Sequence, residues 1–163
     1  MIEISIDIKQ LDSLFDRLKK AAAHPAPLMR QIADVMWDAV EENFAQEGRP
    51  RWQGLKPPGR PGGKILQASG RLAASIVPSS SADTAMVGTN VKYAAIHQFG
   101  GQTRPHRIVA RNAKALKFGN RFARSVNHPG SKIPARPFLV LAPEDEDEIE
   151  QTVSDYLRGV IGG

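Results

Sequence analysis

The sequence of 163 residues has no cysteine, few aromatic residues (6%) and no apolar run of the length that crosses a membrane. The lack of cysteine excludes a disulfide scaffold, a cysteine nucleophile and thiolate ligands for zinc or iron–sulfur clusters. Residues 1–8 alternate apolar and polar side chains, whereas a signal peptide has a basic start and a continuous apolar stretch. We therefore expect a soluble protein that is made in a cytoplasm and has no membrane partner.

Acidic residues are nearly absent from the middle of the chain. Residues 48–136 contain sixteen lysines and arginines but a single acidic residue, Asp83. The net charges of residues 1–47, 48–136 and 137–163 are −4, +15 and −6, which sum to the formal +5. Such segregation fits contact with nucleic acid, neutralisation by an acidic helix of the same chain, or pairing of basic and acidic faces between ring subunits. Charge alone leaves these three interpretations open.

Hydrophobic spacing predicts a single domain over residues 1–163 with an α+β fold. An antiparallel sheet, built from N-terminal and central strands, is expected to pack against two N-terminal helices and one C-terminal helix. The helices are expected over residues 9–23, 28–46 and 144–161, with shorter ones over 64–76 and 93–99. Strands are expected over residues 2–8, 75–80 and 84–89, hairpins within 104–127, and an extended segment over 133–141.

Two long basic segments, residues 48–63 and 100–132, are expected to project from this domain. The first has four prolines and five glycines in sixteen positions, a density that regular structure does not tolerate. Long loops in compact domains are often functional, and we expect these two to become ordered on assembly.

No arrangement of residues indicates an enzyme or a cofactor. The histidines lack the spacing of a metal site, and Ser69-Gly70 lacks the frame of a serine nucleophile elbow. Phosphate-binding and dinucleotide-binding glycine motifs are also missing from the sequence. A hydrolase that uses His97 is the weakest hypothesis. A DNA-binding protein is a stronger one, because aromatic residues are interleaved with the basic ones: Trp52, Tyr93, Phe99, Phe118 and Phe122.

Three groups of motifs together resemble the phage virion morphogenesis family, the tail-completion proteins of Mu-like contractile-tailed phages and prophages. They are Gly48–Trp52 with Leu55, Ile65-Leu66, Ser69–Leu72 and Ser75; Val87–Thr89 with Tyr93–Gly101; and Ile133–Leu139. The resemblance spans about residues 28–160, and Val140 departs from the small residue expected there. It implies a structural protein without catalysis or cofactor, which acts at the head-proximal end of the tail or in the neck.

These motifs also make physical sense without a reaction. Tyr93, Ile96 and Phe99 are spaced so that one short helix could bury them together, and Gly100-Gly101 would let the chain reverse. Pro134 and Pro137 would stiffen an extended segment that presents Arg136, unless Arg136 pairs with an acidic residue of its own chain.

The sequence thus gives two sets of candidate residues. An assembly or binding surface is expected from Arg51, Trp52, Arg60, Lys64, Arg71, Arg104, Arg107, Arg111, Lys114 and Arg136. A structural motif is expected from Gly70, Leu72, Gly88, Tyr93, His97, Gln98, Phe99, Gly100, Gly101, Pro137 and Phe138. The expected partners are further copies in a ring, with six as the working number, and tail-tube, tail-terminator or neck proteins, with DNA contact as the alternative. The expected location is the virion tail or neck, after assembly in the host bacterial cytoplasm.

Overall fold

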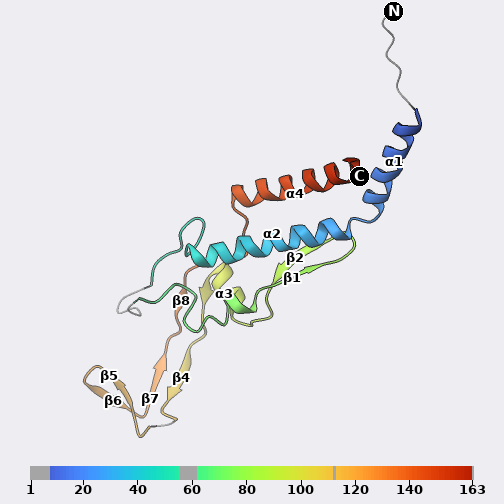
Figure 1. Cartoon of the computed structure of the whole chain (residues 1–163). Helices are drawn as coiled ribbons and strands as arrows, with labels where there is room; N and C mark the ends of the chain where they lie inside the picture. Colours follow the sequence, from blue (N-terminus) through green and yellow to red (C-terminus); the bar gives the residue numbers. More distant parts are fainter. Residues whose placement is uncertain (1–7, 56–61, 112, 163) are drawn as a thin grey trace, which may run out of the picture.

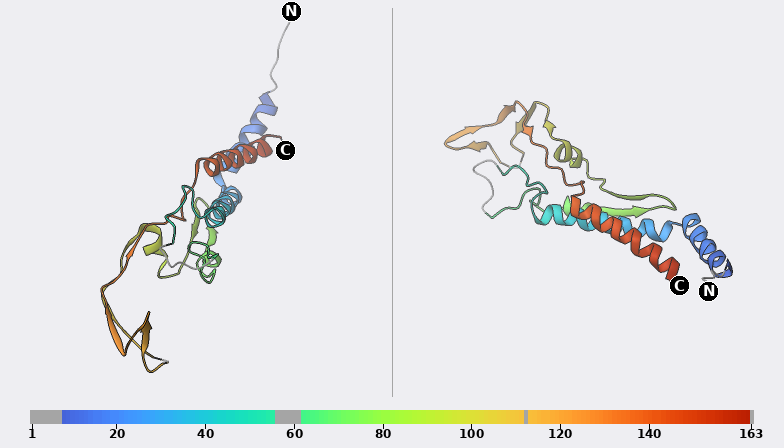
Figure 2. Two further views of the ribbon diagram at one scale, coloured as in Figure 1. Left: turned by 90° about the vertical axis from the view of Figure 1, so that its left-hand side faces the viewer. Right: turned by 90° about the horizontal axis from the view of Figure 1, so that it is seen from above.

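The computed structural model describes residues 8–55, 62–111 and 113–162 of the chain. The molecule is elongated (Figure 1), with helices at one end and a narrow β-stranded arm at the other. Helix α1 lies at the end opposite to this arm, and the two further views agree (Figure 2).

Three long helices form the helical end: α1 (Ile8–Ala23), α2 (Ala26–Ala45) and α4 (Pro143–Gly162). All three were predicted, with bounds that differ by one or two residues. Pro25 and Pro27 separate α1 from α2, because proline fits the first turn of a helix but not its interior. Helix α4 packs against both α2 and α1. Its first turn carries Glu144, Asp145 and Glu146, whose charges suit the positive end of the helix dipole.

The strands form four separate two-stranded antiparallel sheets in the described part of the chain. The pairs are β1 (Val77–Ser80) with β2 (Ala85–Gly88), β3 (Gly101–Gln102) with β8 (Lys132–Ile133), β4 (His106–Val109) with β7 (Ser125–His128), and β5 (Leu116–Phe118) with β6 (Arg121–Ala123). The α+β class is therefore confirmed, but the expectation of one sheet against the helices is wrong. Of these pairs, β1–β2 packs on α2.

The other three pairs follow one another along a single projecting ribbon (Figure 1). We call residues 100–132 the basic arm; it was predicted as a long loop, with hairpins inside it. The hairpins are confirmed. The arm consists of paired strands rather than a loop. Residues of β4 lie opposite residues of β7 in antiparallel register, and the apolar Ile108 and Val126 form one of these cross-strand pairs.

The segment over residues 64–76 was predicted as a helix, and this was wrong. Leu66 and Gly70 have φ angles of 59° and 72°, outside the right-handed helical region. Regular structure here is limited to a 3₁₀ turn, Ala73–Ser75. The short helix predicted over residues 93–99 is found as α3 (Ala94–Phe99). The predicted strand over residues 2–8 lies outside the described residues, apart from Ile8, which begins α1.

The hydrophobic core lies where the helices meet the arm. Its buried members are Val40, Phe44, Trp52, Ile65, Leu72, Ile76, Ala94 and Phe138. Phe138 is fully buried, and its ring centroid lies 5.4 Å from that of Phe44, which contacts Trp52 edge-on at 5.7 Å. The core therefore joins α2, the 64–76 segment, α3 and the extended segment that follows the arm.

Candidate functional site

The extended segment after the arm is held in place by the side chain of Gln98. Its Oε1 accepts hydrogen bonds from the N–H groups of Phe138 (2.9 Å) and Leu139 (3.0 Å), and its Nε2 donates to the carbonyl of Leu139 (3.3 Å). The Arg136 N–H donates to the carbonyl of His97 at 2.7 Å. The structure thus gives Gln98 a clear role, because it satisfies backbone groups that burial would otherwise leave without partners.

Asn43 of α2 holds the same segment from the other side, and sequence reasoning missed it. The residue is completely buried. Its Nδ2 donates to the carbonyls of Phe138 (3.0 Å) and Val140 (2.9 Å), and its Oδ1 accepts from Arg49 Nε (2.9 Å). The available signal was a polar residue on the apolar face of α2. Such a residue usually has a specific partner, because buried polar groups are nearly always hydrogen-bonded.

Arg49 ties the end of α2 to the start of α4. It contacts both carboxylate oxygens of Asp145, at 2.9 and 2.7 Å, as well as the carbonyl of Ala39 at 2.8 Å and Glu144 at 3.2 Å. Burial disfavours the charge of Arg49, but hydrogen bonding and attraction from Asp145, and then Glu144, outweigh it and raise its pKa. The bidentate geometry gives a strong and directional contact. Nothing in the local sequence pattern indicated this pair.

Trp52 and Arg136 were expected on a binding surface, and the structure places both in the interior. Trp52 is 6% exposed, and its Nε1 donates to the carbonyl of Pro137 at 2.8 Å. Arg136 is 8% exposed and donates to the carbonyls of Gln53 (3.0 Å) and Gly54 (3.3 Å). The alternative, an ion pair between Arg136 and an acidic residue, is not found among the described residues either. We call Asn43, Arg49, Trp52, Gln98 and Arg136 the anchoring cluster, because together they fix residues 133–140 against α2 and α3.

The residues of α3 are less buried than their spacing suggested. Phe99 is 79% exposed and Tyr93 is 42% exposed, so the expectation that both are buried with Ile96 is wrong. The helix is only six residues long and turns Ala94 toward the core. The His97 ring lies edge-on to Tyr93 at 5.9 Å, and its buried Nδ1 has no hydrogen-bond partner within residues 8–55, 62–111 and 113–162. Burial, and then the charge of Arg136, lower the pKa of His97, which favours the neutral imidazole.

Gly100 permits the chain reversal that the sequence predicted. Its φ of 72° lies in the left-handed region, and a Cβ at this position would lie 2.8 Å from the Ala135 backbone nitrogen. Two further motif residues differ in what they do. Leu72 is a core residue (2% exposed), while Gly88 ends β2 with open space around it.

The basic arm presents cations without acidic partners in the described part of the chain. All of its lysines and arginines are exposed: Arg104, Arg107, Arg111, Lys114, Lys117, Arg121, Arg124 and Lys132. Residues 100–132 include no Asp or Glu. Arg107 donates to Ser125 Oγ at 2.8 Å, and Lys117 Nζ lies 5.9 Å from the ring centre of Phe122, which is 68% exposed. Four predicted surface residues thus share one element: Arg104, Arg107, Arg111 and Lys114.

The other predicted surface residues lie elsewhere. The Arg51 side chain is 79% exposed, with Nη2 3.7 Å from Glu47 Oε2. Lys64 and Arg71 are also exposed, and Arg60 lies outside the described residues. The ten residues therefore do not form one surface, and a binding role for the exposed ones stays a prediction.

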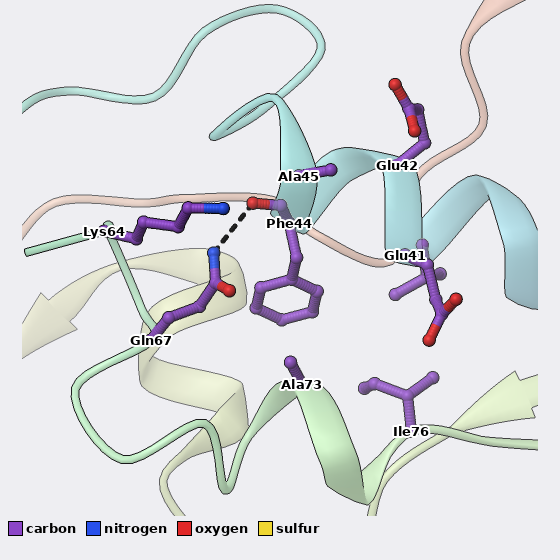
Figure 3. Close-up of a pocket in the computed structure, with 9 residues that line it drawn as sticks. Glu41, Glu42, Phe44, Ala45, Lys64, Gln67, Ala73 and Ile76 are labelled. Atoms are coloured by element: carbon purple, nitrogen blue, oxygen red, sulfur yellow. Dashed lines mark hydrogen bonds between the residues drawn. The ribbon is translucent and has the colours of Figure 1, made fainter.

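A cavity of about 360 Å³ opens at the end of α2 (Figure 3). Phe44, Ala73 and Ile76 form its apolar wall, while the carboxylates and the amine come from Glu41, Glu42 and Lys64. Gln67 Nε2 donates to the Phe44 carbonyl at 2.8 Å. None of the residues that line it forms a nucleophile–base pair.

A second hollow, of about 390 Å³, lies between α2 and the start of α4. We call it the acidic groove. It is lined by Asp38, Ala39, Glu42, Gln46, Arg49, Glu144, Asp145 and Glu148. Arg49 pairs with both Asp145 and Glu144, and because Asp38, Glu42 and Glu148 are also exposed, the lining of the groove stays net negative.

Within the described ranges, His, Asp and Glu side chains form no group of three that could hold a metal ion. No helix among the described residues is long and apolar enough to span a membrane.

Comparison with known proteins agrees with the motifs. The sequence model of the phage virion morphogenesis family matches residues 6–158. The Mu-like prophage FluMu G protein 2 of Haemophilus influenzae is 41% identical over 162 residues, which cover 99% of each chain. No solved structure matches the chain.

Proposed function

Because this chain belongs to the phage virion morphogenesis family, we propose that it completes the phage tail and makes it competent to join the head. The family supports a structural role in building the virion. The finer step, at the tail end or neck, rests on the shape of the molecule and on the distribution of its charge.

The observation that carries this proposal is the separation of two surfaces of opposite charge on one subunit. The basic arm projects from one end of the molecule (Figure 2). The acidic groove lies between α2 and the start of α4. The anchoring cluster fixes the base of the arm to α2 and α3. A subunit that carries unlike charges on two separate surfaces suits head-to-tail contacts, which close into rings when the rotation between neighbours allows it. A ring at the end of a tail would present many arms to the next component.

The proposal is tested by deleting the gene from the phage or prophage and examining the particles by electron microscopy. We expect filled heads and separate tails that do not join, with joining restored by the chain supplied from a plasmid. Normal infectious particles from the deletion would contradict the proposal.

DNA binding is the second candidate, and the exposed cations of the arm favour it. Affinity for duplex DNA should then fall steeply with salt. The slope of log affinity against log salt reports the number of counterions released on binding. Replacing Arg107, Arg111 and Lys114 together by alanine should lower that number by about three at most. Lack of binding to duplex DNA at low salt would remove this candidate.

A further inference from the structure

We propose that the tip of the basic arm of one subunit binds the acidic groove between α2 and α4 of a second copy of the chain. This contact would be the interface between neighbouring subunits of the proposed ring, and in that respect it rests on the proposed function. Self-association itself is measured on the purified protein. It therefore succeeds or fails separately from the role in tail completion.

The arm cannot neutralise its charge within its own chain. The ion pairs of the described residues involve Arg49, Arg51 and Arg158, and none joins the arm to an acidic residue. The arm also points away from α4 in every view (Figures 1 and 2). Eight exposed cations on a two-stranded ribbon repel one another, and such ribbons are only marginally stable alone. A negative surface from outside the subunit would remove this repulsion.

The groove supplies a matching surface. Its four exposed carboxylates come from two helices that the Arg49–Asp145 pair locks together, so their spacing is fixed before binding. Asp38 and Glu148 make no side-chain contact with a cation in the described part of the chain. A preorganised groove loses little entropy when a partner enters it.

Phe122 at the arm tip favours a protein partner over duplex DNA. Its ring is 68% exposed and lies beside the Lys117 amine. Aromatic residues next to cations are typical anchors of protein interfaces, whereas contacts with DNA phosphates need only the cations. Since the same chain carries the complementary groove, a second copy is the partner that the charges fit.

The test uses two charge-reversed variants, Lys117→Glu with Arg121→Glu in the arm, and Asp38→Lys with Glu148→Lys in the groove. All four side chains are exposed, so both variants should fold, which circular dichroism checks. In sedimentation at low salt, wild-type chain should associate, and each variant alone should associate at least about tenfold more weakly. A mixture of the two variants should associate again, because an acidic arm then meets a basic groove and the reverse.

Controls and cross-linking complete the test. Lys92→Glu and Asp16→Lys, which change exposed charges outside the arm and the groove, should leave association unchanged. Because the chain has no cysteine, Phe122→Cys combined with Gln46→Cys should form disulfide-linked oligomers free of background. A wild-type chain that stays monomeric, with a double-cysteine variant that forms no disulfide-linked oligomers, would overturn the proposal. So would an arm variant that loses DNA binding but associates normally, which would assign the arm to DNA.

Discussion

The anchoring cluster and the basic arm differ in how their polar groups are satisfied. In the anchoring cluster, each side chain has a partner at 3.3 Å or less, and the partners come from segments far apart in the sequence. In the arm, Arg107 has a hydrogen bond to Ser125 of the paired strand, and the cations face solvent. The contacts of the cluster therefore lie within one subunit, whereas the cations of the arm are the part for which we propose a partner. The predictions below separate the two regions by their contribution to stability.

The largest effect is expected from Phe138→Ala in the core. Removing a fully buried ring leaves a cavity, so the free energy of unfolding should fall by about 4 kcal/mol. The matched control is Phe122→Ala in the arm, where the ring is 68% exposed and the change should stay below about 1 kcal/mol. Urea denaturation measures both. Equal losses would show that the arm is part of the folded core.

The next effect is expected from breaking the Arg49–Asp145 pair. Arg49→Met leaves Asp145 buried without its cation, which should lower stability by about 3 kcal/mol. Arg51→Met is the control, since its exposed contact with Glu47 at 3.7 Å should contribute less than about 0.5 kcal/mol. Thermal and chemical denaturation would both report the difference. A loss of stability in Arg51→Met as large as that in Arg49→Met would contradict the role given to the Arg49–Asp145 pair in joining α2 to α4.

A smaller effect is expected from the turn at Gly100. Gly100→Ala should cost about 2 kcal/mol, because the new Cβ meets the Ala135 backbone in addition to the unfavourable φ. Gly70→Ala has the same φ of 72° but open space around it, so only the backbone preference should be lost, about 1 kcal/mol. The difference between the two variants isolates the close approach of α3 to the 133–140 segment. Identical losses would mean that the chain shifts to admit the methyl group.

The titration of His97 should give a still smaller effect. Its pKa is lowered in the folded state, first by burial and then by Arg136, relative to the ordinary value of 6.5. The unfolded chain therefore binds a proton more readily, so stability should be constant above that value and fall as the pH drops below it, until the folded-state pKa is reached. His97→Gln should show a shallower decline between neutral and mildly acid pH. An unchanged slope would assign the decline to other groups.

The sequence predicted the parts of this molecule that local patterns control. Periodic apolar residues placed the three long helices, and the turn over residues 81–83 placed β1 and β2 on either side of it. The 64–76 segment was missed because Ile65, Leu72 and Ile76 reach the core from turns rather than from one helical face. Trp52 and Arg136 were misplaced for a related reason: their partners are carbonyls at a distance of more than eighty positions, and no local pattern encodes these. The binding role proposed for the arm residues depends on a surface outside the subunit, which one sequence can suggest only through its charge.

The smallest effect on stability is expected from the arm cations. Replacing Arg107, Arg111 and Lys114 by alanine removes one hydrogen bond and three exposed charges, so the free energy of unfolding of the isolated subunit should change by less than about 1 kcal/mol. Relief of repulsion could even offset the lost bond, and that gain should shrink between about 0.05 and 0.5 M salt because the charges are screened. Denaturation at both salt concentrations tests this, with wild-type chain as the reference. A loss of several kcal/mol would mean that these cations hold the subunit together, and the contrast between the arm and the anchoring cluster would fail.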